Sequence, residues 1–143
     1  MRRHLAAFVI LYLGSAMGTV YAQECLHGPK ESAEQATRRR EALTATRNIN
    51  NLQANQPGSS KGLYLRYEEL AASPYASKMR ESTNETVKRI SLTPGTDVLP
   101  NWQLILDVTA QGYWFMIKDK TDPCGFAYVS NQVGLILSAE PIR

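Results

Sequence analysis

The two cysteines, Cys25 and Cys124, are the residues best suited to react with each other. In an oxidising compartment a single even pair of cysteines forms a disulfide. The rival uses are a redox thiol and a metal site, but the sequence has no CxxC motif, and a metal would need more soft ligands. We therefore predict a structural disulfide that ties Cys25, near the N-terminus, to Cys124 in the last third of the chain.

His27 is the one histidine after residue 22, and it lies two residues beyond Cys25. A catalytic histidine needs a nucleophile beside it, and Cys25 is assigned to the disulfide. The number of available ligands also excludes a zinc site based on histidine. We expect an exposed side chain in a flexible N-terminal stretch, without a catalytic or metal-binding role.

Paired carboxylates can perform acid–base chemistry without a histidine. Glu68 and Glu69 are adjacent, so on a helix they point to different faces. Asp119 and Asp122 flank a turn before Cys124, where three or more oxygens could hold calcium. The simpler interpretation is two solvated loop carboxylates. No P-loop, dinucleotide fingerprint or nucleophile elbow is present, so we predict a protein that is not an enzyme and has no catalytic, cofactor-binding or metal-binding residue.

Two further clusters have simple structural interpretations. The run Arg38–Arg40 fans around a helix and cannot form one patch, which favours a solvated helix face over a docking surface for an acidic partner. Four aromatic residues in the predicted sheet are expected to belong to the core rather than to a ligand platform: Tyr113, Trp114, Phe115 and Tyr128.

A long helix is predicted over Ser32–Ala54. Ser32 and Gln35 have the spacing of a capping box, and apolar residues recur three and four positions apart as far as Leu52. The breaker Gln56–Ser60 ends the pattern. The apolar stripe is narrow and rich in alanine, which suits close packing against a sheet or a helix that partly protrudes.

The last third of the chain predicts an antiparallel meander of about four strands. The expected strands are 102–108, 113–119, 126–130 and 135–139, separated by tight polar turns. Apolar residues on both faces place the second and fourth strands at the centre, with the helix covering one side. The fold class is therefore α+β, a long N-terminal helix packed on a C-terminal meander.

The segment between helix and meander is ambiguous. Residues 63–65 fit a short strand, 67–72 a short helix and 74–82 a further helical turn. Residues 83–92 fit a strand or a loop, and Pro94-Gly95 marks a turn.

The first 22 residues have the layout of a secretory signal peptide. Arg2 and Arg3 precede the apolar run Leu5–Leu13, and small residues lead to Ala22, where we expect cleavage before Gln23. The alternative is a retained anchor, because Leu5–Ala22 approaches the length of a membrane span. Cleavage predicts a periplasmic or extracellular protein in which residues 23–143 form a single domain.

The charge of the exported chain gives little guidance to its partners. Without Arg2 and Arg3 it has 14 basic and 13 acidic residues, a net charge of +1. This balance does not argue for binding to nucleic acid or to an anionic membrane. We expect a protein partner and no cofactor.

The order of these elements resembles the soluble headgroup of type IV pilins and type II secretion pseudopilins. Residues 45–53 are similar to the helix before the variable region of those proteins, and 67–71 to its short helix. Residues 123–136 are similar to the closing hairpin. The resemblance implies a structural or protein-interaction domain that binds through its sheet edge, its variable region (Gly62–Pro94) or the loop holding Cys124.

The N-terminus departs from the pilin pattern. Prepilins are cut after a glycine that precedes their apolar stretch, which then forms the filament core with a glutamate at its fifth position. Here Gly18 follows the apolar stretch, and the fifth residue beyond it is Gln23. The resemblance therefore implies a headgroup released from the membrane. The alternative is a small secreted ligand-binding or inhibitor module with a helix gripped by a curved sheet, as in cystatin-like folds.

Overall fold

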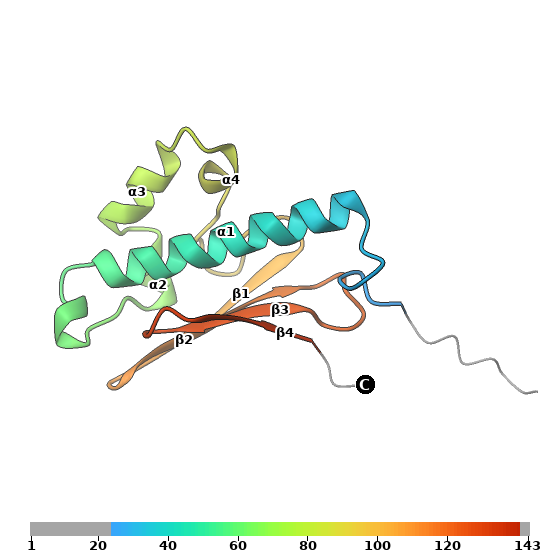
Figure 1. The fold of residues 1–143 in the computed structure, drawn as a ribbon. Helices are drawn as coiled ribbons and strands as arrows, with labels where there is room; N and C mark the ends of the chain where they lie inside the picture. Colours follow the sequence, from blue (N-terminus) through green and yellow to red (C-terminus); the bar gives the residue numbers. More distant parts are fainter. Residues whose placement is uncertain (1–23, 141–143) are drawn as a thin grey trace, which may run out of the picture.

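A single long helix, α1 (Ala33–Asn55), crosses one face of a four-stranded antiparallel sheet (Figure 1). The structure is a computed structural model that describes residues 24–140. The strands follow one another in sequence order: β1 (Trp102–Thr109), β2 (Gly112–Asp119), β3 (Ala127–Asn131) and β4 (Ile136–Ala139). The predicted α+β fold with a β-meander is confirmed. The predicted signal peptide, 1–22, lies outside the described residues.

The helix begins at the predicted capping box. The Ser32 hydroxyl accepts a hydrogen bond from the Gln35 backbone N–H at 3.2 Å, and the Gln35 side chain accepts one from the Ser32 N–H at 2.7 Å. These two bonds satisfy donors that a helix start otherwise leaves free. The apolar stripe then faces the sheet, and Ala42, Ala45 and Ile49 are fully buried.

The face of the sheet beneath α1, the inner face, carries the core. Alternate residues of β1 and β2 point into it, and the aromatic rings of Trp102 and Phe115 are at most 1% exposed. Tyr113 and Tyr128 are also buried there, so the core assignment is correct for three of the four predicted aromatics. Trp114 points to the other face and is 42% exposed, because side chains alternate along a strand.

Two buried amides of α1 replace apolar packing with specific hydrogen bonds. Asn50 donates to the Ser130 hydroxyl at 2.7 Å and accepts from the Tyr113 hydroxyl at 3.0 Å, which links the helix to β3 and β2. Gln53 bonds both the N–H and the carbonyl of Leu65, as a neighbouring strand would. Residues 63–65 form neither helix nor strand, so the short strand predicted there is absent.

The middle segment packs three short helices beside α1. They are α2 (Tyr67–Leu70), α3 (Pro74–Arg80) and α4 (Glu85–Lys88), preceded by the 3₁₀ turn η1 (Ser59–Lys61). The first two agree with the prediction, whereas α4 replaces the strand or loop expected over 83–92. Asn84 starts α4 by accepting hydrogen bonds from the N–H groups of Thr86 and Val87, a local capping signal that the periodicity did not reveal.

The expected central position of the fourth strand is wrong. The sheet order places β4 at the edge, and the central strands are β2 and β3. Leu135 and Leu137 are 60% and 56% exposed, so these apolar side chains are not covered by the described residues.

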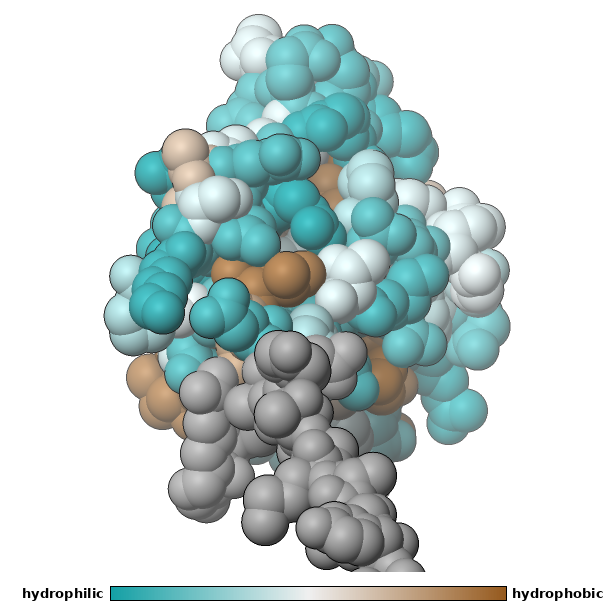
Figure 2. Space-filling model, turned by 90° about the vertical axis from the view of Figure 1, so that its right-hand side faces the viewer, coloured by the Kyte–Doolittle hydropathy of each residue, from teal (hydrophilic) through white to brown (hydrophobic). Residues whose placement is uncertain are grey.

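The sheet face opposite α1, the outer face, has an apolar centre. Cross-strand pairing aligns Ile105, Met116, Val129 and Leu137 in one row. All four are partly or largely exposed, whereas Ala127 beside them is 1% exposed. Figure 1 shows the helices gathered on the inner side of the sheet. Viewed from the end where α1 begins, the surface is mostly hydrophilic, with hydrophobic atoms in separate spots (Figure 2).

Candidate functional site

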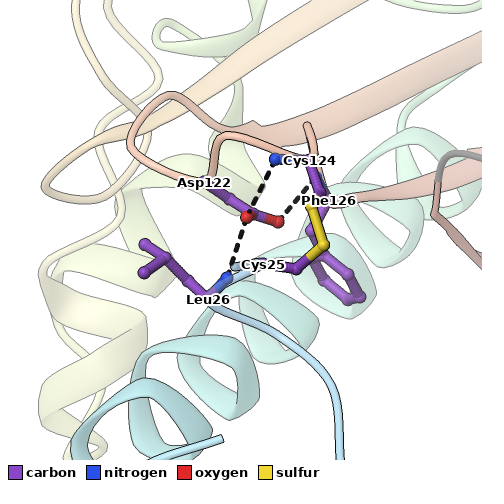
Figure 3. The surroundings of a disulfide bond; sticks show 5 residues. All are labelled: Cys25, Leu26, Asp122, Cys124 and Phe126. Atoms are coloured by element: carbon purple, nitrogen blue, oxygen red, sulfur yellow. Dashed lines mark hydrogen bonds between the residues drawn. A yellow bond between two sulfur atoms is a disulfide. The ribbon is translucent and has the colours of Figure 1, made fainter. Parts of the chain in front are cut away.

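The predicted disulfide joins the N-terminal segment to the loop between β2 and β3. Cys25 and Cys124 are bonded, with their Cα atoms 5.2 Å apart and 99 residues between them in sequence. Figure 3 shows the bond beside the backbone of both segments. A crosslink over so long a loop restricts the unfolded chain strongly.

Asp122 reinforces this junction from inside. Its carboxylate accepts hydrogen bonds from the backbone N–H groups of Leu26 at 2.9 Å, Cys124 at 3.1 Å and Phe126 at 3.0 Å (Figure 3). The residue is 6% exposed. One carboxylate thus shapes the β2–β3 loop and fastens the N-terminal segment to it.

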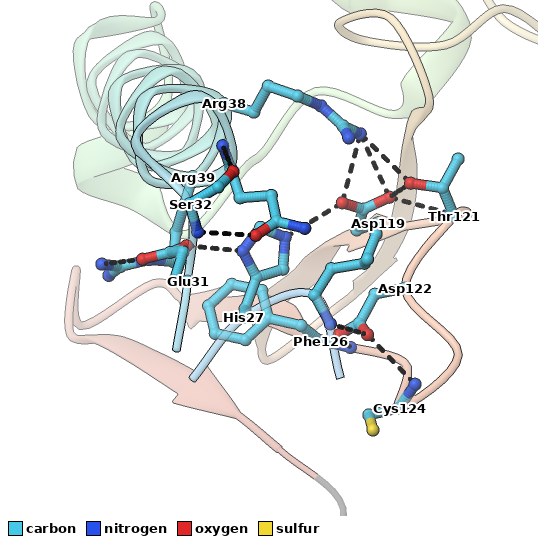
Figure 4. A network of polar contacts seen from close by, with 12 residues as sticks. His27, Glu31, Ser32, Arg38, Arg39, Asp119, Thr121, Asp122, Cys124 and Phe126 are labelled. Atoms are coloured by element: carbon cyan, nitrogen blue, oxygen red, sulfur yellow. Dashed lines mark hydrogen bonds and ion pairs between the residues drawn. The ribbon is translucent and has the colours of Figure 1, made fainter. Parts of the chain in front are cut away.

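His27 is buried, contrary to the expected exposed side chain. It is 3% exposed, and its ring packs 4.7 Å from the Phe126 ring centroid. Its Nδ1 lies 2.7 Å from Glu31 and its Nε2 lies 3.0 Å from Asp119. The two ring nitrogens therefore face one carboxylate each (Figure 4).

Asp119 is the centre of the second half of the network. Its side chain is fully buried at the end of β2, and it accepts from His27, from the Arg38 guanidinium at 3.2 Å and from the Thr121 hydroxyl at 2.6 Å. The Thr121 backbone N–H adds a bond at 2.8 Å. The prediction of solvated loop carboxylates is therefore wrong for both Asp119 and Asp122.

The arginine run is divided between partners rather than wholly solvated. Arg38 reaches Asp119, and Arg39 forms a two-pronged contact with Glu31 at 2.8 to 3.1 Å. Arg40 stays exposed and bonds the Thr37 hydroxyl. Consecutive residues point in different directions around a helix, as expected. The Arg38 and Arg39 side chains nevertheless each reach a mostly buried acid, Asp119 and Glu31 respectively.

The electrostatics favour ionised acids in this network, which we name the N-terminal clamp: His27, Glu31, Arg38, Arg39 and Asp119. The hydrogen bond from Arg39 lowers the pKa of Glu31 below its usual value. Burial raises the pKa of Asp119, but hydrogen bonds from Thr121 and His27 outweigh it, so that pKa is also lowered. The pairing compensates for the cost of burying these charges.

The clamp is arranged for holding the chain rather than for catalysis. Both ring nitrogens of His27 face carboxylates, and the ring is shielded by Phe126 and Trp102. Neither nitrogen is therefore free to take a proton from a substrate. Across residues 24–140, no group of three or more histidine, cysteine or acidic side chains is placed to hold a metal ion.

The remaining predicted acids have local roles. Glu69 accepts a hydrogen bond from the Arg66 backbone N–H at 2.7 Å and so caps the start of α2. Glu68 is exposed on the same short helix. The structure does not bring these two carboxylates together with the acids of the N-terminal clamp.

The outer face is the second candidate site, and sequence reasoning did not single it out. Trp114 projects from it beside Asp107, which accepts a hydrogen bond from the indole N–H at 3.2 Å. An open depression of about 200 Å³ adjoins the ring and is also lined by Tyr113 and Gln132. Trp114 and Met116 are apolar at positions of β2 where strict alternation would place polar residues. This interruption was the sequence signal for an apolar outer face.

Of the three predicted binding regions, two are occupied or contribute to the core, and one is exposed. The loop holding Cys124 is occupied by the N-terminal segment, and the variable region buries Leu70, Met79 and Leu92 in the core. The edge strand β4 keeps its exposed apolar side chains. It is continuous with the row across the outer face.

No known protein family, curated protein or solved structure matches this chain. None of the helices between residues 24 and 140 has the length and apolar character needed to cross a membrane.

Proposed function

We propose that this chain is an exported, non-enzymatic protein-interaction domain of the pilin-headgroup kind, which binds its partner through the outer face. The observation that carries the proposal is the apolar row Ile105–Met116–Val129–Leu137, which the described helices leave uncovered. An apolar surface rimmed by polar residues is typical of a protein-binding site.

The N-terminal junction supports an exported location. A disulfide is stable in oxidising compartments and rare in the cytosol. The clamp and the disulfide fix the segment that follows the predicted cleavage site, so the domain would keep its structure after losing residues 1–22. Both features suit a domain that works outside the cell membrane.

A filled interior favours an interaction domain over the cystatin-like ligand-binding alternative. Such a module needs an apolar cavity between helix and sheet. Ile49, Phe115 and Ile117 occupy that space and are completely buried, and the depression beside Trp114 lies at the hairpin end of the sheet instead. The start of α1 lies over the sheet rather than beyond it, with Arg38 bonded to the end of β2. Because α1 does not protrude beyond the sheet, only the order of the elements supports the comparison with a pilin headgroup.

Photo-crosslinking in producing cells tests the proposal. A benzophenone amino acid at Leu137 or Trp114 samples the outer face, and the same residue at Glu68 or Lys78 samples the helical side. We expect protein adducts from the exported fraction at the first two positions and few at the controls. Equal labelling at all four positions, or no adduct at the outer face, would refute the proposed role of this face.

A further inference from the structure

We propose that the partner of the outer face is a second copy of this chain, so that two sheets stack face to face in a symmetric dimer. The inference rests on the proposed function of the outer face and specifies its occupant. It is carried by the distribution of apolar and charged side chains across the four strands.

The centre of the face is complementary to itself. Ile105, Met116, Val129 and Leu137 lie side by side on four strands, in a row perpendicular to the strand direction. A two-fold axis along this row would place each apolar side chain against its own copy. Closed two-fold symmetry is the commonest arrangement of identical subunits and requires such a self-complementary patch.

The two charges of the face lie on opposite sides of that row. Asp107 is two residues beyond Ile105 on β1, and Lys118 is two residues beyond Met116 on β2 in the opposite direction. Their separation along the strands is about 13 Å, too far for an ion pair within one copy. The two-fold axis exchanges the two sides of the row, so each copy's Lys118 would approach the other copy's Asp107.

Trp114 completes this complementarity. It lies on β2 directly across from Asp107, to which its indole N–H is bonded. Under the same two-fold axis, the ammonium of Lys118 from the second copy would lie over this indole ring and beside the carboxylate. A cation above tryptophan is attracted to the ring face, and the neighbouring carboxylate adds an ion pair.

The competing symmetric arrangement lacks these contacts. A two-fold axis parallel to the strands would place β1 over β4 and β2 over β3, so Lys118 would face Ala127 instead of a carboxylate. The charge pattern therefore selects antiparallel stacking, in which sheets pack about 10 Å apart.

The size of the face sets the expected strength. Strands of these lengths, about 4.8 Å apart, give a projected area of about 400 Å² per copy. Two copies would together bury about 800 Å², which is below the size of stable complexes and in the range of weak, transient ones, so we expect a dissociation constant of about 100 µM.

Sedimentation equilibrium of the exported, oxidised protein from about 1 to 500 µM tests the inference. We expect a monomer–dimer equilibrium that Asp107→Lys and Lys118→Asp each weaken by about tenfold or more, because like charges would then meet across the interface. The double variant D107K/K118D should bind at least about tenfold more tightly than either single variant. Glu68→Lys and Lys61→Asp repeat the same charge changes away from the face and should leave the dimer unchanged.

Near-ultraviolet circular dichroism and an intact disulfide verify that each variant is folded. A monomer at all concentrations would overturn the inference, and so would a dimer insensitive to both single variants or not restored in the double variant. A monomer that still forms outer-face adducts with a different protein would overturn the self-association while leaving the proposed function in place.

Discussion

Replacing Asp119 by asparagine tests whether the N-terminal clamp stabilises the fold through charge. The substitution preserves the shape of the side chain but removes the negative charge that faces His27 and Arg38. It also brings an amide N–H₂ toward groups that are themselves donors. Because the Asp119 side chain is completely buried and that of His27 is 1% exposed, water cannot readily replace the lost partner.

The magnitude follows from the burial of each partner. Removing one member of a buried charge pair costs about 3 to 5 kcal/mol. Arg38 is 26% exposed at its side chain and can regain water, so we expect a loss near the lower end, about 3 kcal/mol. With the usual denaturant dependence of a small domain, this lowers the urea midpoint by about 1 to 3 M.

The pH dependence of this loss has a definite sign. The folded-state pKa of Asp119 lies below its ordinary value of 3.8, so the stability it contributes is present above about pH 4. That stability is lost as the pH falls through the lowered pKa, because the wild-type side chain then becomes neutral as well. The difference between D119N and wild type should therefore shrink below about pH 4.

Urea unfolding followed by tryptophan fluorescence measures the effect, since Trp102 is buried beside the clamp. Asp97→Asn is the matched control, because Asp97 pairs with Lys120 at 2.7 Å on the surface, where an ion pair contributes at most about 1 kcal/mol. A D119N loss no larger than that of D97N, or one that does not diminish in acid, would refute the reasoning.

Three further substitutions test other parts of the fold by the same unfolding assay. The double variant C25A/C124A should lose about 2 to 5 kcal/mol, because the bond closes a loop with a sequence separation of 99; a loss below 1 kcal/mol would contradict this. Asn50→Ala should cost about 1 to 3 kcal/mol, because the buried Tyr113 hydroxyl loses its acceptor and Ser130 keeps only its bond to the Leu135 carbonyl; a neutral effect would argue against the link from α1 to the sheet. Tyr67→Phe should be neutral or stabilising by up to about 1 kcal/mol, since within residues 24–140 its hydroxyl is buried without a hydrogen-bond partner; a clear loss would reveal a partner for that group.

The elements with strong local signals were predictable from sequence. The capping box at Ser32 and the breaker after Asn55 bounded α1 to within a residue, and the alternation of β2 bounded that strand equally well. The short helix α4 was harder to predict, because its four residues show no apolar period. The helix α4 is defined by the Asn84 cap rather than by a repeating apolar pattern.

The same holds for the candidate sites: the disulfide was predictable from sequence, and the N-terminal clamp was not. Two cysteines allow one pairing, so the sequence alone identified the disulfide. It did not reveal that His27, Glu31 and Asp119 meet, because Asp119 is 92 residues from His27. The available signal was that Asp119 continues the buried face of β2, two residues after Ile117.

The sequence by itself determined the helix, the strands, their antiparallel connections and the disulfide, because caps, turns, alternation and cysteine number act over short ranges or leave one choice. The tertiary structure alone decided which charges are buried and which apolar residues are exposed. Those properties depend on what packs against each side chain from distant parts of the chain. In the clamp, the docking of α1 on the sheet therefore brings Arg38 and Arg39 to the mostly buried acids Asp119 and Glu31, and the outer face is a set of apolar residues that this docking leaves uncovered.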